Sequence, residues 1–178
     1  MPVARTLRGV VSDPAGDAHR TSANPPDLTS ATIEVANGSV SITVDYTPGS
    51  VSASDVYIVV VLDTDMNPAT GYPGVTGGAT DSSLIGGDYL ISIPMAPASS
   101  VVAITRATSA TALTRVGTTT VSFGATEAQL SFPLALLVGT DGHMAFKVVS
   151  AQYLNGTTST TGVSDIMPDA GLPPGLVQ

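Results

Sequence analysis

The sequence predicts an all-β protein, an antiparallel β-sandwich of the jelly-roll type with about nine or ten strands. Short segments in which apolar and polar residues alternate recur along the chain, and turn residues separate them roughly every 8–12 residues. One segment, residues 56–62, is apolar without alternation, which is typical of a strand buried on both faces. We therefore expect this strand to lie at the centre of the fold.

Length and composition indicate one extracellular domain. The chain has 178 residues and no internal repeat or linker that would divide it, so we expect a single domain over residues 1–178. It contains no cysteine, which excludes disulfides and thiolate metal sites. A net charge of −8 with only six Lys and Arg argues against a nucleic-acid partner. Only 11% of the residues are charged while Thr, Ser and Gly are abundant, a composition typical of secreted or cell-surface β-proteins.

Neither a membrane span nor a signal peptide is expected. No segment approaches the roughly 18–20 apolar residues that cross a bilayer. Residues 1–5 lead into a strand-like segment without a long apolar run, so we expect an excised module whose signal peptide is absent.

The first third of the chain predicts an edge strand and a hairpin. Residues 1–11 form an extended N-terminal segment in which Leu7 and Val10 are the expected anchors, and a turn follows at residues 12–17. Alternation then runs from Thr32 to Val44 and is interrupted by Asn37-Gly38, a strong signal for a two-residue hairpin turn. A connection over residues 47–54 leads to the central strand.

Beyond the central strand we expect a meander with one helical turn. A Gly-rich surface loop covers residues 72–87, the helical turn falls at residues 133–138, a Thr-rich loop covers residues 156–162, and an irregular tail covers residues 163–178. Further strands are expected over residues 88–93, 101–106, 112–116, 121–123, 128–132 and 144–149.

The loop after the central strand predicts a calcium site. Asp63, Asp65 and Asn67 have the D-x-D-x-N spacing by which calcium collects oxygen ligands, and Asp88 is the best candidate for a further ligand, with Asp81 a weaker one. The loop is not an EF-hand, since it lacks the Gly at the sixth position and the Glu at the twelfth. The alternative is that these side chains only bond their own backbone, as in Asx turns.

Four aspartates near the two ends of the chain could form a second metal site. Because chain termini often lie close together in a compact domain, we predict that residues 12–17 lie against residues 165–169. The residues concerned are Asp13, Asp17, Asp165 and Asp169. Asp27 is placed either to cap a turn or to reach a cation. The alternative is a set of unrelated turn carboxylates, and if these groups met without a cation their repulsion would be costly.

No catalytic constellation is visible in the sequence. His19 and His143 lie in polar turns without the spacing of metal ligands, and a Ser/His/Asp triad would depend on these same two histidines. There is no Trp, so Tyr72 and Tyr153 are the only expected aromatic platforms for a sugar. We expect a protein that is not an enzyme.

The chain resembles β-sandwich modules of secreted bacterial proteins, which are distantly similar to family 9 carbohydrate-binding and DOMON-like domains. The matching segments are residues 12–17, 26–28, 62–71, 87–91 and 165–169. The resemblance implies a jelly-roll-like sandwich with calcium and without catalysis, although the chain lacks the tryptophans of the sugar-binding branch.

Three functions are compatible with these observations. The first is a non-enzymatic, Ca²⁺-stabilised accessory or interaction module of an extracellular bacterial protein. The second is a carbohydrate-binding module, whose partner would be a glycan. The third is a self-assembling surface or fibre subunit, in which the extended N-terminal segment pairs with another copy of the chain.

Overall fold

The structure, a computed structural model, describes residues 5–18, 26–48, 56–73, 85–95, 100–152 and 163–178. Within these ranges the regular structure is β-strand apart from one turn of 3₁₀-helix, η1 (Leu134–Leu136). The strands are β1 (Leu7–Ser12), β2 (Leu28–Ala36), β3 (Ser39–Tyr46), β4 (Val56–Asp63), β5 (Tyr89–Pro94), β6 (Val101–Ala107), β7 (Leu113–Phe123), β8 (Glu127–Pro133), β9 (Met144–Gln152), β10 (Val163–Met167) and β11 (Gly175–Val177).

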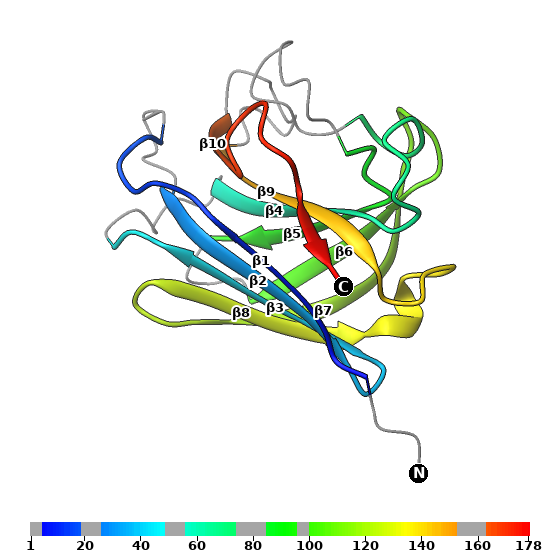
Figure 1. Cartoon of the computed structure of the whole chain (residues 1–178). Helices are drawn as coiled ribbons and strands as arrows, with labels where there is room; N and C mark the ends of the chain where they lie inside the picture. Colours follow the sequence, from blue (N-terminus) through cyan, green and yellow to red (C-terminus); the bar gives the residue numbers. More distant parts are fainter. Residues whose placement is uncertain (1–4, 19–25, 49–55, 74–84, 96–99, 153–162) are drawn as a thin grey trace.

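Hydrogen bonds connect ten of these strands in one antiparallel path. The order is β1-β2-β3-β8-β7-β6-β5-β4-β9-β10, and β11 pairs with β9 beside β10. The long strand β7 joins the two halves of the path, because its first part pairs with β6 and residues 121–123 pair with β8. The sheet curls until it is nearly closed into a barrel-like shape (Figure 1). The all-β antiparallel prediction is confirmed, whereas the separate packed sheets of a jelly-roll sandwich are not confirmed.

The first and last strands of the chain, β1 and β11, meet at a seam that closes the curl of the sheet. The Arg8 N–H donates to the Gln178 carbonyl at 3.2 Å. Gly9 and Gly175 both lie against the ring of Phe146, and a Cβ at Gly9 would fall 2.5 Å from the Leu176 carbonyl oxygen. The close approach of the first and last strands therefore requires the absence of a side chain at these glycines.

Strand β4 is central, and both of its faces are covered. Ile58, Val60 and Leu62 point into the main core, while Val59 and Val61 belong to a second apolar cluster on the opposite face. Strands β5 and β9 flank β4 along its length. The prediction of a doubly buried central strand is confirmed, since an apolar residue at every position leaves no face suited to water.

The hairpin turn and the helical turn predicted from the sequence are also confirmed. Asn37 and Gly38 have φ of 52° and 75° and connect Ala36 to Ser39, the arrangement of a two-residue type I′ hairpin. The helical turn expected at residues 133–138 is η1.

Three expectations differ from the structure. The tail at residues 163–178 is not irregular throughout, because it contains β10 and β11, which are too short to show a periodic pattern. Val10 is 51% exposed and is not an anchor, since Leu7 and Val11 occupy the inward positions of β1. Residues 112–116 and 121–123 were expected as two strands, but β7 runs through both because the threonines between them suit a strand.

Several expected segments lie outside the described residues. They are most of the connection at 47–54, residues 74–84 of the Gly-rich loop, and the Thr-rich loop at 156–162. In the described part of the chain, no helix has the length and apolar character needed to cross a bilayer.

Replacing Gly9 by Ala should destabilise the protein, because the new methyl group would meet the Leu176 backbone and the Phe146 ring. Overpacking of this kind costs about 1–3 kcal/mol, and each kcal/mol lowers the melting temperature by roughly 2–4 °C in a protein of this size. Thermal unfolding followed by circular dichroism measures the change. Val10→Ala, at the exposed neighbouring position, should change stability by about 0.5 kcal/mol or less. A Gly9→Ala variant as stable as the wild type would contradict the close packing of the seam.

Candidate metal centres

The first candidate centre, the loop site, lies where β4 ends and β5 begins. Asp63 is the last residue of β4, and the Asp88 N–H donates to the Leu62 carbonyl at 2.8 Å just before β5. Carboxylate oxygens of Asp63, Asp65 and Asp88 all lie within 4.8 Å of one another. The structure therefore brings together the three carboxylates that the sequence predicts for this site.

Two close crossings of the chain hold this loop in place. Tyr72 and Gly87 exchange two backbone hydrogen bonds of 2.8 Å each. Gly71 and Gly86 have φ of 71° and 63°, and a Cβ at Gly71 would fall 2.6 Å from the Gly86 carbonyl oxygen. Gly71 and Gly86 both adopt the left-handed conformation that glycine tolerates, and the role of Gly86 depends on a contact with a segment distant in sequence.

Hydrogen bonds within the loop orient its side chains. Oδ2 of Asp88 accepts from the Thr64 N–H at 2.9 Å, from the Thr64 hydroxyl at 2.8 Å and from the Asp65 N–H at 3.2 Å. Asp65 accepts from the Asn67 N–H at 2.9 Å, and Asn67 Oδ1 accepts from the Ala69 N–H at 3.2 Å. These last two bonds are the Asx turns of the alternative interpretation, so Asn67 as a metal ligand stays a prediction.

The electrostatics of the loop site disfavour a full set of ionised carboxylates. Asp63 is only 2% exposed, and this burial raises the pKa of its carboxyl to about 6. The neighbouring Asp65 also raises this pKa, while the Asn67 N–H, which donates to Asp63 at 3.2 Å, lowers it. A bound cation would offset both the burial and the repulsion.

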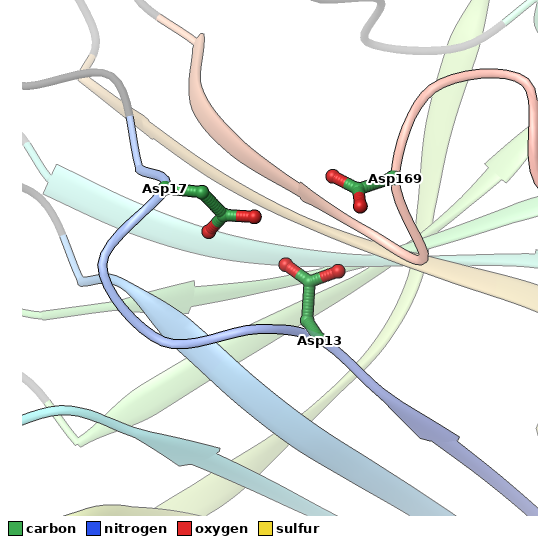
Figure 2. Close-up of side chains that lie close together, drawn as sticks. All are labelled: Asp13, Asp17 and Asp169. Carbon is green, nitrogen blue, oxygen red and sulfur yellow. The ribbon is translucent and has the colours of Figure 1, made fainter.

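The second candidate centre, the terminal site, lies where the two ends of the chain meet. Asp13 and Asp17 follow β1, and Asp169 follows β10; their carboxylates point toward one another, as Figure 2 shows. The carboxylate oxygens of these three residues lie within 4.8 Å of one another, and Asp17 forms a second such group with Asp27 and Asp165. The prediction that residues 12–17 lie against residues 165–169 is confirmed.

Two of these carboxylates also fix the local backbone. Asp27 accepts hydrogen bonds from the Gly16 N–H at 2.9 Å and from the Thr47 hydroxyl at 3.1 Å, so it caps the turn that carries Asp17. Oδ2 of Asp165 accepts from the Leu28 N–H at 2.6 Å and thereby ties β10 to β2. Asp27 thus performs the capping role that its position in the sequence suggested.

In the described part of the chain, the carboxylate of Asp13 lacks a hydrogen bond at one of its two oxygens. Its Oδ2 is buried and has no hydrogen-bond partner among the described residues. Burial raises the pKa of Asp13 to about 7, and the other charges that raise it belong to Asp165, Asp169, Asp17 and Asp27. Burial likewise raises the pKa of Asp165 to about 6, against the opposing effect of the Leu28 N–H. A proton or a cation at this oxygen-rich site would therefore relieve the unfavourable electrostatics.

Two further candidate residues that the structure describes, His143 and Tyr72, do not join either centre. His143 lies in a surface turn, where its Nδ1 is 2.9 Å from Asp141 Oδ1 and its Nε2 is 3.4 Å from Arg5 Nη2. Tyr72 is half-buried against the outer apolar cluster and presents no open platform. His19, Asp81 and Tyr153 lie outside the described residues.

Comparison of the chain with protein-family models, with curated proteins and with solved structures finds no significant match in any of the three.

Without a bound cation, the protein should lose stability as the pH rises. The pKa of Asp13 is about 7 and those of Asp63 and Asp165 are about 6 in the folded protein, against an ordinary value of 3.8. The folded state therefore binds more protons than the unfolded state between about pH 4 and pH 7, and its stability falls across that range. Melting temperatures measured in chelator should be higher at about pH 5 than at about pH 8. Asp13→Asn should flatten this profile, and a profile that rises over the same range would contradict the raised pKa values.

Proposed function

We propose that the protein is a non-enzymatic, calcium-stabilised accessory or interaction module of an extracellular protein. The observation that carries the proposal is the convergence of Asp63, Asp65 and Asp88 at the end of the doubly buried central strand. The terminal site, with the buried and unpartnered oxygen of Asp13, supports it.

Calcium fits the chemistry of both sites. Their candidate ligands are carboxylates, which suit hard cations, whereas zinc favours His and Cys. Calcium accepts about six to eight oxygens in flexible geometry, so backbone carbonyls and water can complete an irregular set of side chains. Magnesium demands a near-octahedral arrangement and releases its water reluctantly.

The positions of the sites favour a structural role for the ion. An ion at the loop site would connect the end of β4 to the start of β5, and one at the terminal site would connect the segments that follow β1 and β10. Both are junctions between parts of the chain that are distant in sequence. An extracellular setting suits such sites, because modules in that compartment work with weak calcium affinities of about 10⁻⁴–10⁻³ M.

The alternative functions receive less support from the described residues. An aromatic sugar platform at Tyr72 is not favoured, because this ring packs against the outer apolar cluster. β1 pairs with β2 of its own chain from Leu7 to Ser12, and exchange of this strand between copies stays the third candidate function.

Chelation of calcium should lower the melting temperature by ~5–10 °C. A ligand at 100 times its dissociation constant stabilises a protein by about 2.7 kcal/mol, and each kcal/mol corresponds to roughly 2–4 °C for a chain of this length. Differential scanning calorimetry with calcium, with magnesium and with excess chelator measures the effect, and elemental analysis first establishes that the protein carries calcium. Equal melting temperatures in calcium and in chelator would rule out the structural role.

Substitutions should separate the two sites. Asp63→Asn is expected to remove calcium binding at the loop site and Asp13→Asn at the terminal site, each seen as the loss of one class of binding in isothermal titration calorimetry. Asp141→Asn is the matched control, because Asp141 is an exposed turn carboxylate outside both sites. In chelator at about pH 8, Asp13→Asn should be more stable than the wild type, since it removes a charge from a repulsive group. Unchanged calcium binding in both variants would contradict the assignment.

A further inference from the structure

The first part of β7 is paired on one side only. It pairs with β6 along its length, but its ladder with β8 covers only residues 121–123. A pocket lined by β3, β7 and β8 opens where β7 and β8 separate. Among the described residues, no second strand pairs with residues 113–118 on the side away from β6. We call residues 113–118 the β7 edge. Such an edge is a template for pairing with another chain.

The register with β6 shows which backbone groups of the β7 edge face away from β6. The Val121 N–H donates to the Ser100 carbonyl at 2.8 Å, and Thr119 and Gly117 follow at every second position in the same unbroken register. Neighbouring residues of a strand direct their backbone groups to opposite sides of the strand. The N–H and C=O of Thr118 therefore point away from β6, toward an added strand.

The same alternation holds at the other end of the β7 edge. The Thr108 N–H donates to the Ala112 carbonyl at 2.9 Å where β6 turns into β7. The residues that face β6 are thus the even-numbered ones here, and the backbone groups of Leu113 and Arg115 point away from it. The change of phase falls at Val116, which is the extra residue of a bulge between β6 and β7.

Solvent reaches the β7 edge from both faces of the sheet. Every residue from 113 to 116 is exposed, although successive side chains of a strand point to opposite faces. Below this stretch, Leu136 of η1 packs against the core and lies under Gly117, where a Cβ would fall 3.0 Å from its Cδ1. The edge is therefore supported at Gly117 and open over the residues that precede it.

The hairpin of β6 and β7 is basic in an acidic protein. The chain carries a net charge of −8, yet none of its fourteen acidic residues falls between residues 100 and 126. Arg106 and Arg115 both lie in this hairpin and are exposed. Within the described residues, neither arginine forms an ion pair. Charge complementarity therefore favours an acidic partner at this hairpin.

We infer that the β7 edge binds an extended, acidic segment of a partner protein, which adds a strand beside β7. In strand addition the backbone hydrogen bonds supply the affinity, here through Thr118 and Arg115, and the side chains supply the selectivity. The arginine side chain selects acidic residues opposite it. The inference goes beyond the calcium sites of the proposed function, and no step of it depends on them.

A second copy of the chain fits this edge less well than an acidic segment does. Antiparallel pairing of two copies, centred on the β7 edge, would bring their Arg115 side chains together, and like charges opposite each other are destabilising. The bulge at Val116 also disfavours a regular pairing between two identical edges.

The test is a titration of the full ¹⁵N-labelled chain with two blocked octapeptides, followed by NMR. One peptide alternates Val and Glu, and the other alternates Val and Lys. We expect the Glu peptide to shift the amide signals of residues 113–118, and the Lys peptide to leave them unchanged. At five times its dissociation constant, the Glu peptide should slow hydrogen exchange at Arg115 and Thr118 by about sixfold. No shift with the Glu peptide at about 5 mM, five times a millimolar dissociation constant, would overturn the inference. Equal shifts with both peptides would overturn the acidic partner.

Variants separate the charge from the backbone. Arg115→Glu should weaken binding of the Glu peptide by about fivefold or more and allow the Lys peptide to bind. Thr118→Pro removes an outward N–H and should weaken binding without changing the charge. Arg5→Glu is the matched control, because Arg5 is an exposed arginine outside the hairpin and its replacement changes the net charge equally. Melting temperatures establish that each variant is folded. Unchanged affinity in Arg115→Glu, or an equal loss in Arg5→Glu, would contradict the assignment.

Sedimentation velocity of the free chain separates a partner protein from a second copy. We expect a monomer at the concentration of the titration. A dimer that dissociates in Thr118→Pro would show that the edge pairs with another copy and would overturn the acidic partner.

Repeating the titration in chelator separates this inference from the proposed function. Peptide binding that persists in chelator supports the β7 edge, whether or not the melting temperature falls. A calcium effect on the melting temperature without peptide binding supports the metal centres and overturns the inference.

Discussion

The curled sheet has to close where its first and last strands meet, and it does so without a continuous ladder of hydrogen bonds. Among the described residues, a backbone hydrogen bond from the Arg8 N–H to the Gln178 carbonyl joins β1 to the end of the chain after β11. The rest of the contact is packing, in which Gly9 and Gly175 bring two backbones onto the ring of Phe146. A seam held by packing tolerates little change in volume, because protein interiors are close-packed. The positions of the chain ends, and of everything attached to them, depend on this contact.

Closure of the seam concentrates negative charge at one end of the molecule. The segment that follows β1 and the segment that follows β10 both carry aspartates, and closing the sheet brings Asp13, Asp17 and Asp169 together. The free energy gained by packing therefore works against electrostatic repulsion among these groups. Protonation relieves this repulsion as the pH falls, and a bound cation would relieve it at neutral pH. The stability of the seam therefore responds to pH and to the ionic conditions.

The loop site arises from a different constraint, the burial of both faces of β4. Ile85 and Leu90 join Val59 and Val61 in the apolar cluster on the outer face, and Tyr72 packs against this cluster after the chain has left β4. The crossing of Gly71 and Gly86 permits this packing, and it places Asp88 beside Asp63 and Asp65. The pocket lined by β3, β7 and β8 has a third origin, since it forms where β7 exchanges one neighbour for another. The two candidate metal centres and this pocket are therefore separate consequences of the same continuous sheet.

The sequence by itself determined the features that depend on local conformation. Asn37-Gly38 specifies its turn through positive φ, residues 56–62 specify a doubly buried strand through their unbroken apolar character, and the spacing of Asp63 and Asp65 marks the loop site. Only the tertiary structure decided that the sheet curls into one path, that β10 and β11 complete it, and that Asp27 caps the turn beside Asp17. The physical reason is the separation in sequence over which each effect acts. Backbone preference and alternation act between near neighbours, whereas the seam, the crossing at Gly86 and the burial of Asp13 depend on contacts between segments far apart in the chain.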